Sequence, residues 1–229
     1  MLGHNLESRT RVSLPADTRP ILIVVVDTEE EFDWTKQFDR SSTGVTAINE
    51  LHRGQAVFDD FGLRPIYVID YPVASTESSF SVLKELRESE RAHVGLQLHS
   101  WVSPPLEEEI TRANSYQGNL PLGLERRKLH FLFETIERNL QFKPTIHKAG
   151  RYGFGQHTAE HLLDLGINIG LSASPGFDHS ADGGPDFTRI DAHFYRFGTQ
   201  QALFNIPTTG GFMGPLHQLG PLIHSVSGK

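Results

Sequence analysis

The chain has 229 residues, of which 38% are hydrophobic, so it is long enough to bury one sizeable core. Its formal net charge of −7 argues against a nucleic-acid partner, because the sequence has no basic stripe to neutralise phosphates. The absence of cysteine excludes disulfide bonds, thiolate metal sites and a cysteine nucleophile. We therefore expect a single domain over residues 1–229.

The N-terminal segment 1–19 is polar and contains acidic residues in place of a continuous apolar stretch. Such a segment is neither a secretory signal nor a membrane span. We predict that it is a lead-in to the first strand, that the protein has no membrane span, and that its location is cytoplasmic.

Six consecutive aliphatic residues, Ile21–Val26, predict a strand that is buried on both faces, as in parallel sheets covered by helices. Two carboxylates, Asp27 and Glu29, follow this strand, at the position where α/β enzymes keep catalytic groups. Functional use is therefore the favoured interpretation of Asp27 and Glu29. A solvated acidic loop is the favoured interpretation of the next acidic residues, Glu30, Glu31 and Asp33.

Helices and strands alternate along the rest of the chain. Helical periodicity predicts helices over residues 46–61, 79–87, 124–140 and 156–165. Short apolar runs predict strands over residues 65–69, 94–98, 145–147 and 167–171, and the stretch 174–186 is expected to be a long loop. Such alternation indicates an α/β fold with parallel strands and right-handed crossovers. Histidines on the helices, including His161, are expected at solvated surfaces.

Side chains that follow parallel strands converge at one rim of the sheet, although they are far apart in sequence. The residues that the sequence places there are Asp27, Glu29, Asp70, His99, Lys148, Arg151, Ser172 and Pro207. Carboxylates with a histidine could hold a divalent metal that polarises a water and a carbonyl, while a second carboxylate accepts the proton of the water. This donor set predicts hydrolysis of an amide or an ester.

Aromatic residues near the same turns suit stacking on a sugar ring, and these are Trp34, Trp101 and Tyr152. Packing in the core or at the rim is the alternative for each, because tryptophan and tyrosine occupy both environments. We expect all three to line an acidic cleft that accepts a saccharide.

Four motifs follow one another along the chain: VVVDTEEEFDW (24–34), HVGLQLHSWVSPP (93–105), KAGRYGFG (148–155) and LSASPGFD (171–178). In this order they resemble the polysaccharide deacetylase superfamily, the NodB-homology group of carbohydrate esterases. The closest resemblance is to its WalW-like branch, which is associated with surface-polysaccharide loci, and it spans about residues 20–207. The resemblance implies a distorted (β/α) barrel with about seven parallel strands. It also implies a divalent metal, with zinc expected, held by a carboxylate and two histidines, and removal of an N-acetyl or O-acetyl group from a carbohydrate.

The resemblance implies roles for individual residues. Asp27 would be the general base, Glu29 and His99 would be metal ligands, and two residues of the third motif, Lys148 and Arg151, would take part in catalysis. The general acid of the family has its only reasonable counterpart in His224, five residues from the end of this sequence.

The motifs depart from the family pattern at three positions. Gln97 stands where WalW-like members have the first histidine of Gly-x-His-Leu-His-x-Trp, and an amide oxygen is a poor substitute for imidazole on zinc. Lys148 replaces an arginine, which keeps the charge but loses the planar fork of the guanidinium. Gly170 stands where an aspartate often precedes the Ser-x-x-Pro element. Together these replacements describe a degenerate metal motif.

Two functions therefore compete. The first is a metal-dependent hydrolase that removes an acetyl group from a carbohydrate or sugar intermediate in surface-polysaccharide biosynthesis. The second is a catalytically degenerate protein that binds a saccharide or a partner without metal chemistry. The first is favoured because Asp27, Glu29, His99 and the turn at residues 150–152 occur together.

Overall fold

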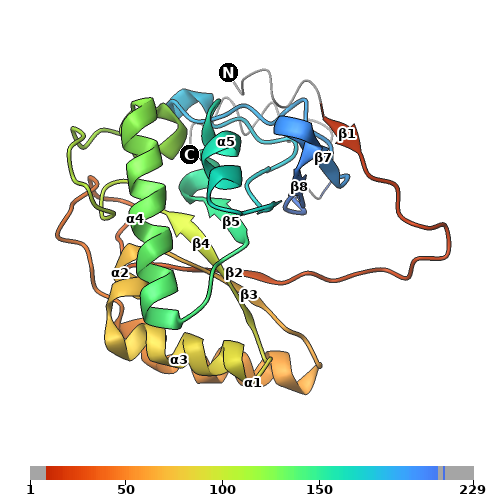
Figure 1. Cartoon of the computed structure of the whole chain (residues 1–229), viewed down its shortest axis with the longest axis horizontal. Helices are drawn as coiled ribbons and strands as arrows, with labels where there is room; N and C mark the ends of the chain where they lie inside the picture. Colours follow the sequence, from red (N-terminus) through yellow and green to blue (C-terminus); the bar gives the residue numbers. More distant parts are fainter. Residues whose placement is uncertain (1–8, 211–213, 215–229) are drawn as a thin grey trace.

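The computed structural model of the protein describes residues 9–210 and residue 214. One eight-stranded sheet runs through this part of the chain in the order β1-β7-β8-β6-β5-β4-β3-β2 (Figure 1). The strands are β1 (Thr10–Arg11), β2 (Val25–Thr28), β3 (Ile66–Ile69), β4 (His93–Leu98), β5 (Ile146–Ala149), β6 (Ile169–Gly170), β7 (Tyr195–Phe197) and β8 (Leu203–Asn205). From β2 to β6 and on to β8 all neighbours pair in parallel, and β7 runs antiparallel to β1 and β8. The predicted α/β class with parallel strands is confirmed, and the described residues form six parallel strands where about seven were expected.

In the described part of the chain, five α-helices follow the strands: α1 (Leu51–Asp60), α2 (Tyr71–Ser75), α3 (Glu77–Glu88), α4 (Leu122–Leu140) and α5 (Thr158–Asp164). Short 3-10 turns are η1 (Thr46–Glu50), η2 (Ala113–Ser115), η3 (Gln117–Asn119), η4 (Gly150–Tyr152), η5 (Ser180–Asp182) and η6 (Thr199–Gln201). The four predicted helices correspond to η1 with α1, α3, α4 and α5. Within the described residues, no helix combines the length and apolar character that crossing a membrane requires.

The core lies on both faces of the central strands, because successive side chains of a strand point to opposite faces. Tyr67 and Ile69 of β3 join the larger apolar cluster with residues of α3 and α4, while Ile66 and Val68 join a smaller cluster with Leu171. Burial on both faces explains the continuous apolar runs of these strands. In Figure 1 the long helix α4 lies along the strands, and it contacts β4, α2, α3 and α5.

The first predicted strand is only partly correct. Strand β2 begins at Val25, and Ile21, Leu22 and Ile23 are 60%, 70% and 37% exposed, in contrast to the burial expected of them. Strand β2 is the last strand of the sheet and pairs with β3 alone, so nothing among the described residues continues the sheet beyond it. A continuous apolar run therefore does not distinguish a central strand from an edge.

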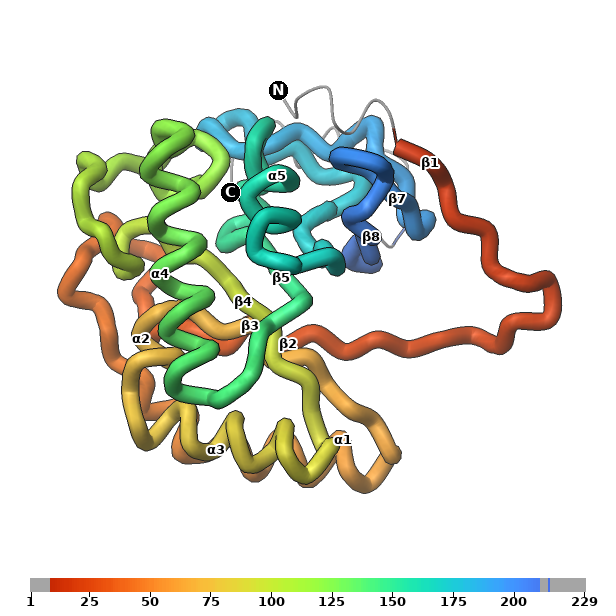
Figure 2. The backbone as a smooth tube through the Cα atoms, viewed as in Figure 1, coloured from red at the N-terminus to blue at the C-terminus, as the bar shows by residue number. Residues whose placement is uncertain are grey.

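The lead-in segment contributes to the sheet, which the sequence did not predict. Thr10 and Arg11 pair with Arg196 and Tyr195 of β7, and the chain then makes a wide excursion before it returns to β2 (Figure 2). The short strands β7 and β8 were also missed, because three-residue strands carry too few residues for a pattern of alternation.

Candidate functional site

Asp27 lies in β2 and its carboxylate accepts a hydrogen bond from the ammonium group of Lys148 in β5. The Lys148 side chain is 5% exposed, whereas that of Asp27 is 41% exposed. The lysine Nζ atom also lies 4.6 Å from the ring centroid of Tyr152. A buried cation thus orients an accessible carboxylate at the end of β2.

Glu29, Gln97 and His99 form a second group beside Asp27. Gln97 Nε2 donates a hydrogen bond to Glu29 Oε2 at 2.9 Å and lies 3.3 Å from His99 Nε2, which is itself 3.3 Å from Glu29 Oε2. Gln97 and His99 come from the C-terminal end of β4 and are buried, while the Glu29 side chain keeps 21% of its surface exposed. Burial raises the pKa of Glu29, the charge of His99 opposes this rise, and Asp27 adds to it.

Two further carboxyl groups lie behind the imidazole of His99. Glu30 Oε2 is 2.7 Å from His99 Nδ1, and Asp70 Oδ2 is 3.9 Å from the same atom. Asp70 also accepts the backbone N–H of Glu30 at 3.0 Å and that of Val73 at 3.1 Å, so it caps the start of α2. Burial raises the pKa of Glu30 to about 7 and raises that of Asp70 well above its usual range, and their mutual interaction adds to the rise for Asp70.

The position of Glu30 corrects the prediction of a solvated loop, because this side chain is buried. One signal could have found it. Side chains alternate along a strand and its extension, so Glu30 must point away from Asp27 and Glu29, toward the helix-covered face of the sheet. Only Glu31 and Asp33 are exposed as expected.

The residues present fit a divalent cation. Glu30, Asp70 and His99 each offer one ligand atom, all within 4.8 Å of one another, so this buried group could hold a metal ion. On the other side of the same imidazole, the Glu29, Gln97 and His99 atoms form a triangle with edges of 2.9 to 3.3 Å. Two ligands bound at about 2.1 Å to a tetrahedral ion lie about 3.4 Å apart, so Glu29 Oε2 and His99 Nε2, at 3.3 Å, have the spacing of a ligand pair. A metal-binding histidine usually donates its other ring N–H to a carboxylate, and Glu30, 2.7 Å from His99 Nδ1, would in this way leave Nε2 for the ion.

The three aromatic residues proposed for sugar binding differ in accessibility. Trp34 is 51% exposed, and its ring lies 6.4 Å from that of His99 at nearly a right angle. Tyr152 lies under Lys148 and stacks on His179 at 5.5 Å. Trp101 is only 1% exposed and stacks on His99 at 4.4 Å. Trp101 therefore has no free face for a sugar and instead supports the imidazole.

Arg151 is bound to the loops above the rim. Its guanidinium group pairs with Asp182 at 3.0 Å and lies 4.1 Å from the ring centroid of Tyr116. Its backbone is left-handed, with φ of 53°, and Tyr152 has φ of 59°. The side chain that contacts Asp27, the predicted base, is Lys148. Arg151 contacts Asp182. The candidate general acid His224 lies outside the described residues.

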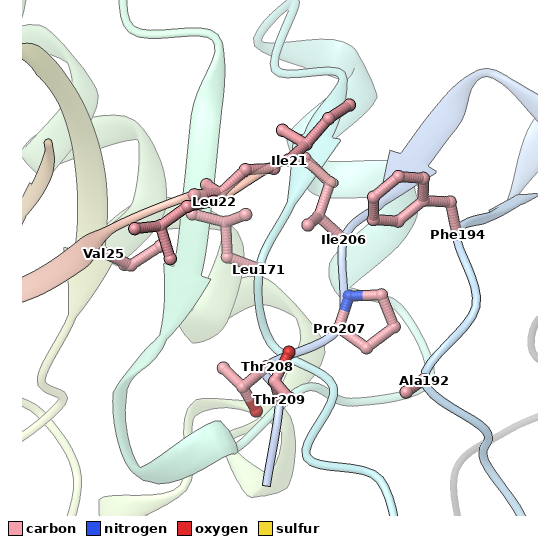
Figure 3. A pocket seen from close by; sticks show the side chains of 11 residues that line it. Ile21, Leu22, Val25, Leu171, Ala192, Phe194, Ile206, Pro207, Thr208 and Thr209 are labelled. Carbon is pink, nitrogen blue, oxygen red and sulfur yellow. The ribbon is translucent and has the colours of Figure 1, made fainter. Parts of the chain in front are cut away.

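One pocket opens at the edge of β2, and another lies beside the aromatic cluster around His99. An apolar pocket of about 440 Å³ opens beside the edge of β2 (Figure 3). Its walls include Ile21, Leu22, Leu171, Phe194, Ile206 and Pro207. A second pocket of about 600 Å³ is lined mainly by polar side chains, including Thr35, Gln37, Thr111 and Arg112. Phe38 also lines it, and the Phe38 ring lies 4.6 Å from that of Trp101, so the polar pocket adjoins the aromatic cluster around His99.

Comparison with known proteins places the fold among deacetylase structures. The chain aligns with a candidate polysaccharide deacetylase from Mycobacterium smegmatis with a TM-score of 0.52 and 13% identity, over 87% of this chain and 62% of the other. The chain thus spans less than two thirds of that protein.

Two other solved structures are similar at lower scores. A variant of the peptidoglycan deacetylase PdaC from Bacillus subtilis has a TM-score of 0.40 and 11% identity, over 64% of this chain and 55% of the other. The deacetylase domain of BpsB from Bordetella bronchiseptica has a TM-score of 0.43 and 14% identity, over 72% of this chain and 66% of the other. No family model matches the sequence, and no curated protein matches it. At 13% identity, the likeness to the Mycobacterium smegmatis structure establishes the fold alone.

Proposed function

We propose that this protein is a metal-dependent hydrolase that removes an N-acetyl or O-acetyl group from a carbohydrate or sugar intermediate in surface-polysaccharide biosynthesis. The observation that carries the proposal is the convergence of Asp27, Glu29 and His99, from the ends of β2 and β4, in a deacetylase-like fold. The motif resemblance to the WalW-like branch supports the same substrate class. The cytoplasmic location and the single domain over residues 1–229 stay predictions.

The proposal gives the residues around His99 separate roles in hydrolysis. A divalent cation bound by Glu29 and His99 would polarise the acyl carbonyl and acidify the attacking water. Asp27 takes the proton of that water, and Lys148 holds its carboxylate in position. Trp34 offers its exposed face to the sugar. His224 remains the candidate that returns a proton to the leaving group.

Replacement of the base tests the proposal. Asp27→Asn should lower acetate release by about a hundredfold to ten-thousandfold, because an amide cannot accept the proton of the water. Its metal content should stay near that of the unmodified chain. Acetate is measured with a panel of N-acetylated and O-acetylated oligosaccharides, and metal by elemental analysis.

The control is Asp33→Asn, an exposed carboxylate outside the group around His99, which should leave activity unchanged. Glu29→Ala and His99→Ala should lose both metal and activity. Full acetate release by Asp27→Asn would refute the assignment of the base.

One observation favours the second function, a saccharide-binding protein without metal chemistry. The Gln97 amide already donates to Glu29 and contacts His99, so hydrogen bonds alone can hold these two side chains together. This alternative predicts that no acetylated saccharide is hydrolysed with zinc, cobalt, nickel or manganese. It also predicts that saccharide binding is unchanged in Asp27→Asn, Glu29→Ala and His99→Ala, and that Trp34→Ala weakens it.

A further inference from the structure

The side-chain amide of Gln97 is held by only one of its two ends. Gln97 Nε2 donates to Glu29 Oε2 at 2.9 Å and lies 3.3 Å from His99 Nε2. Gln97 Oε1 is buried and has no hydrogen-bond partner among the described residues. A buried acceptor without a partner costs free energy, so its presence next to two potential ligands requires an explanation.

Rotation of the amide by half a turn would change which of its two atoms faces Glu29 and His99. It exchanges the two atoms and places Oε1 at the corner of the triangle that Nε2 now occupies. Without a cation this orientation is unfavourable, because the oxygen would face the Glu29 carboxylate and the lone pair of His99 Nε2. With a cation between them the preference reverses, because all three atoms are then ligands. Either orientation leaves one amide atom unpaired on the side away from Glu29 and His99. The presence of the cation therefore decides which orientation is favoured.

We propose that Gln97 is the third ligand of the cation site through Oε1, and that its amide turns over when the cation binds. This inference rests on the proposed function for the position of the site, between Glu29 and His99. The donor set is then two oxygens and one nitrogen, where the family pattern has one oxygen and two nitrogens. Oxygen ligands suit manganese and magnesium, whereas imidazole suits zinc. The site therefore discriminates less strongly in favour of zinc than a site with histidine at this position.

The Nδ1 side of His99 supports this choice of ligand atoms. Glu30 Oε2 lies 2.7 Å from His99 Nδ1. In the tautomer that carries its proton on Nδ1 and donates it to Glu30, the lone pair of Nε2 is directed toward Glu29 and Gln97. Glu29 is the only member of the triangle whose side chain is more than slightly exposed, so a cation enters past Glu29.

The test compares the full-length chain with Gln97→His, Gln97→Glu and Gln97→Leu. Manganese and zinc chlorides are titrated by calorimetry, and the Kd ratio of the two metals is calculated for each protein. Gln97→His should raise the preference for zinc over manganese by at least about tenfold. Gln97→Glu, which is isosteric and adds a charged oxygen, should bind manganese about tenfold or more tightly than the unmodified chain. Gln97→Leu should bind both metals more weakly.

A second measurement follows the amide directly. The side-chain NH₂ resonances of Gln97, identified by their loss in Gln97→Glu, should shift on addition of magnesium, because Nε2 loses its hydrogen bond to Glu29. Unchanged resonances at saturating magnesium would overturn the proposed rotation.

The outcomes separate this inference from the proposed function. An unchanged metal ratio in Gln97→His, or full manganese affinity in Gln97→Leu, refutes the amide ligand even if acetate is released with zinc. The expected ratios without hydrolysis of any acetylated saccharide refute the proposed function alone. Failure of every variant and of the unmodified chain to bind either metal refutes both.

Discussion

Gly150 lies directly against the imidazole of His99. A Cβ atom at this position would come within 2.4 Å of His99 Cδ2 and 2.5 Å of the Leu98 carbonyl oxygen. The residue follows β5 at the start of η4, so this contact joins two of the strands that bear the site. Glycine is required here by the close approach of the His99 side chain, since even one methyl group has no space.

Gly150→Ala should therefore displace His99 and destabilise the fold by about 1 to 3 kcal/mol, as overpacking does in a dense interior. The measurement is urea unfolding, together with zinc affinity, which should fall as His99 moves. Gly54→Ala in α1 is the matched control, because nothing lies within 4 Å of the added carbon. It should stabilise the helix by up to about 1 kcal/mol. Equal free energies of unfolding for the two variants would show that His99 moves aside without loss of stability.

At the scale of elements, α4 holds the loop that follows β4. Lys128 is fully buried, and its Nζ atom donates to the carbonyl oxygens of Ser100 at 3.0 Å and Ser103 at 2.6 Å. It also pairs with Glu108 at 2.9 Å. Burial lowers the pKa of Lys128, and the pairing with Glu108 opposes that change. The loop carries Trp101, so this lysine indirectly supports the packing behind His99.

Lys128→Met should destabilise the protein by about 3 to 5 kcal/mol, because it leaves the buried Glu108 carboxylate without a counter-charge. The neighbouring pair Arg127–Glu107 is more than half exposed, so Arg127→Met should change stability by less than about 1 kcal/mol. Urea unfolding of both variants provides the comparison. If both variants lose the same stability, the contacts of Lys128 with the loop after β4 stabilise the fold no more than the exposed Arg127–Glu107 pair does.

At the scale of the whole molecule, one buried polar network joins β5, η3, α4 and α5. His147 Nε2 lies 3.2 Å from Gln117 Oε1, and Gln117 Nε2 donates to Glu125 Oε1 at 3.3 Å, which also accepts from Thr158. His161 of α5 is 3.7 Å from Glu125 and is buried, which corrects the prediction of a surface histidine. Burial lowers the pKa of His147 to about 3 and raises that of Glu125 to about 7.

These two groups should make opposite contributions to the pH dependence of stability. His147 stays neutral in the folded state while the unfolded chain binds a proton below about pH 6.5, so stability is lost as the pH falls from about 6.5 to 3. Glu125 keeps its proton in the folded state to about pH 7, so stability is lost as the pH rises from about 4.5 to 7. The limiting slope of each is about 1.4 kcal/mol per pH unit.

Difference curves from urea unfolding isolate each contribution. Relative to the unmodified chain, Glu125→Gln should gain stability as the pH rises from about 4.5 to 7. His147→Gln should gain relative stability as the pH falls from about 6.5 to 3. Curves that run parallel to that of the unmodified chain would contradict the assigned pKa shifts.

Much of the fold and part of the site follow from local patterns. Helical periodicity located α1, α3, α4 and α5, because burial of one face of a helix leaves a repeat in the sequence. Apolar runs that end in a polar residue placed Asp27, Glu29 and His99 at one rim, since parallel strands end on one side of a sheet. Glu30 was missed because four acidic residues close together resemble a solvated segment.

By itself, then, the sequence determined the α/β class, the succession of strands and helices, and the strand ends that bear Asp27, Glu29 and His99. These features depend on hydrophobic periodicity and on strand direction, and both can be read from residues that are close together in the sequence. Only the tertiary structure decided which strand lies at the edge, and therefore that Ile21–Ile23 are exposed. It also decided that Glu30 and Trp101 pack around His99, and that Lys148, not Arg151, contacts Asp27. Such contacts join residues far apart in the chain, so no local pattern of the sequence contains them.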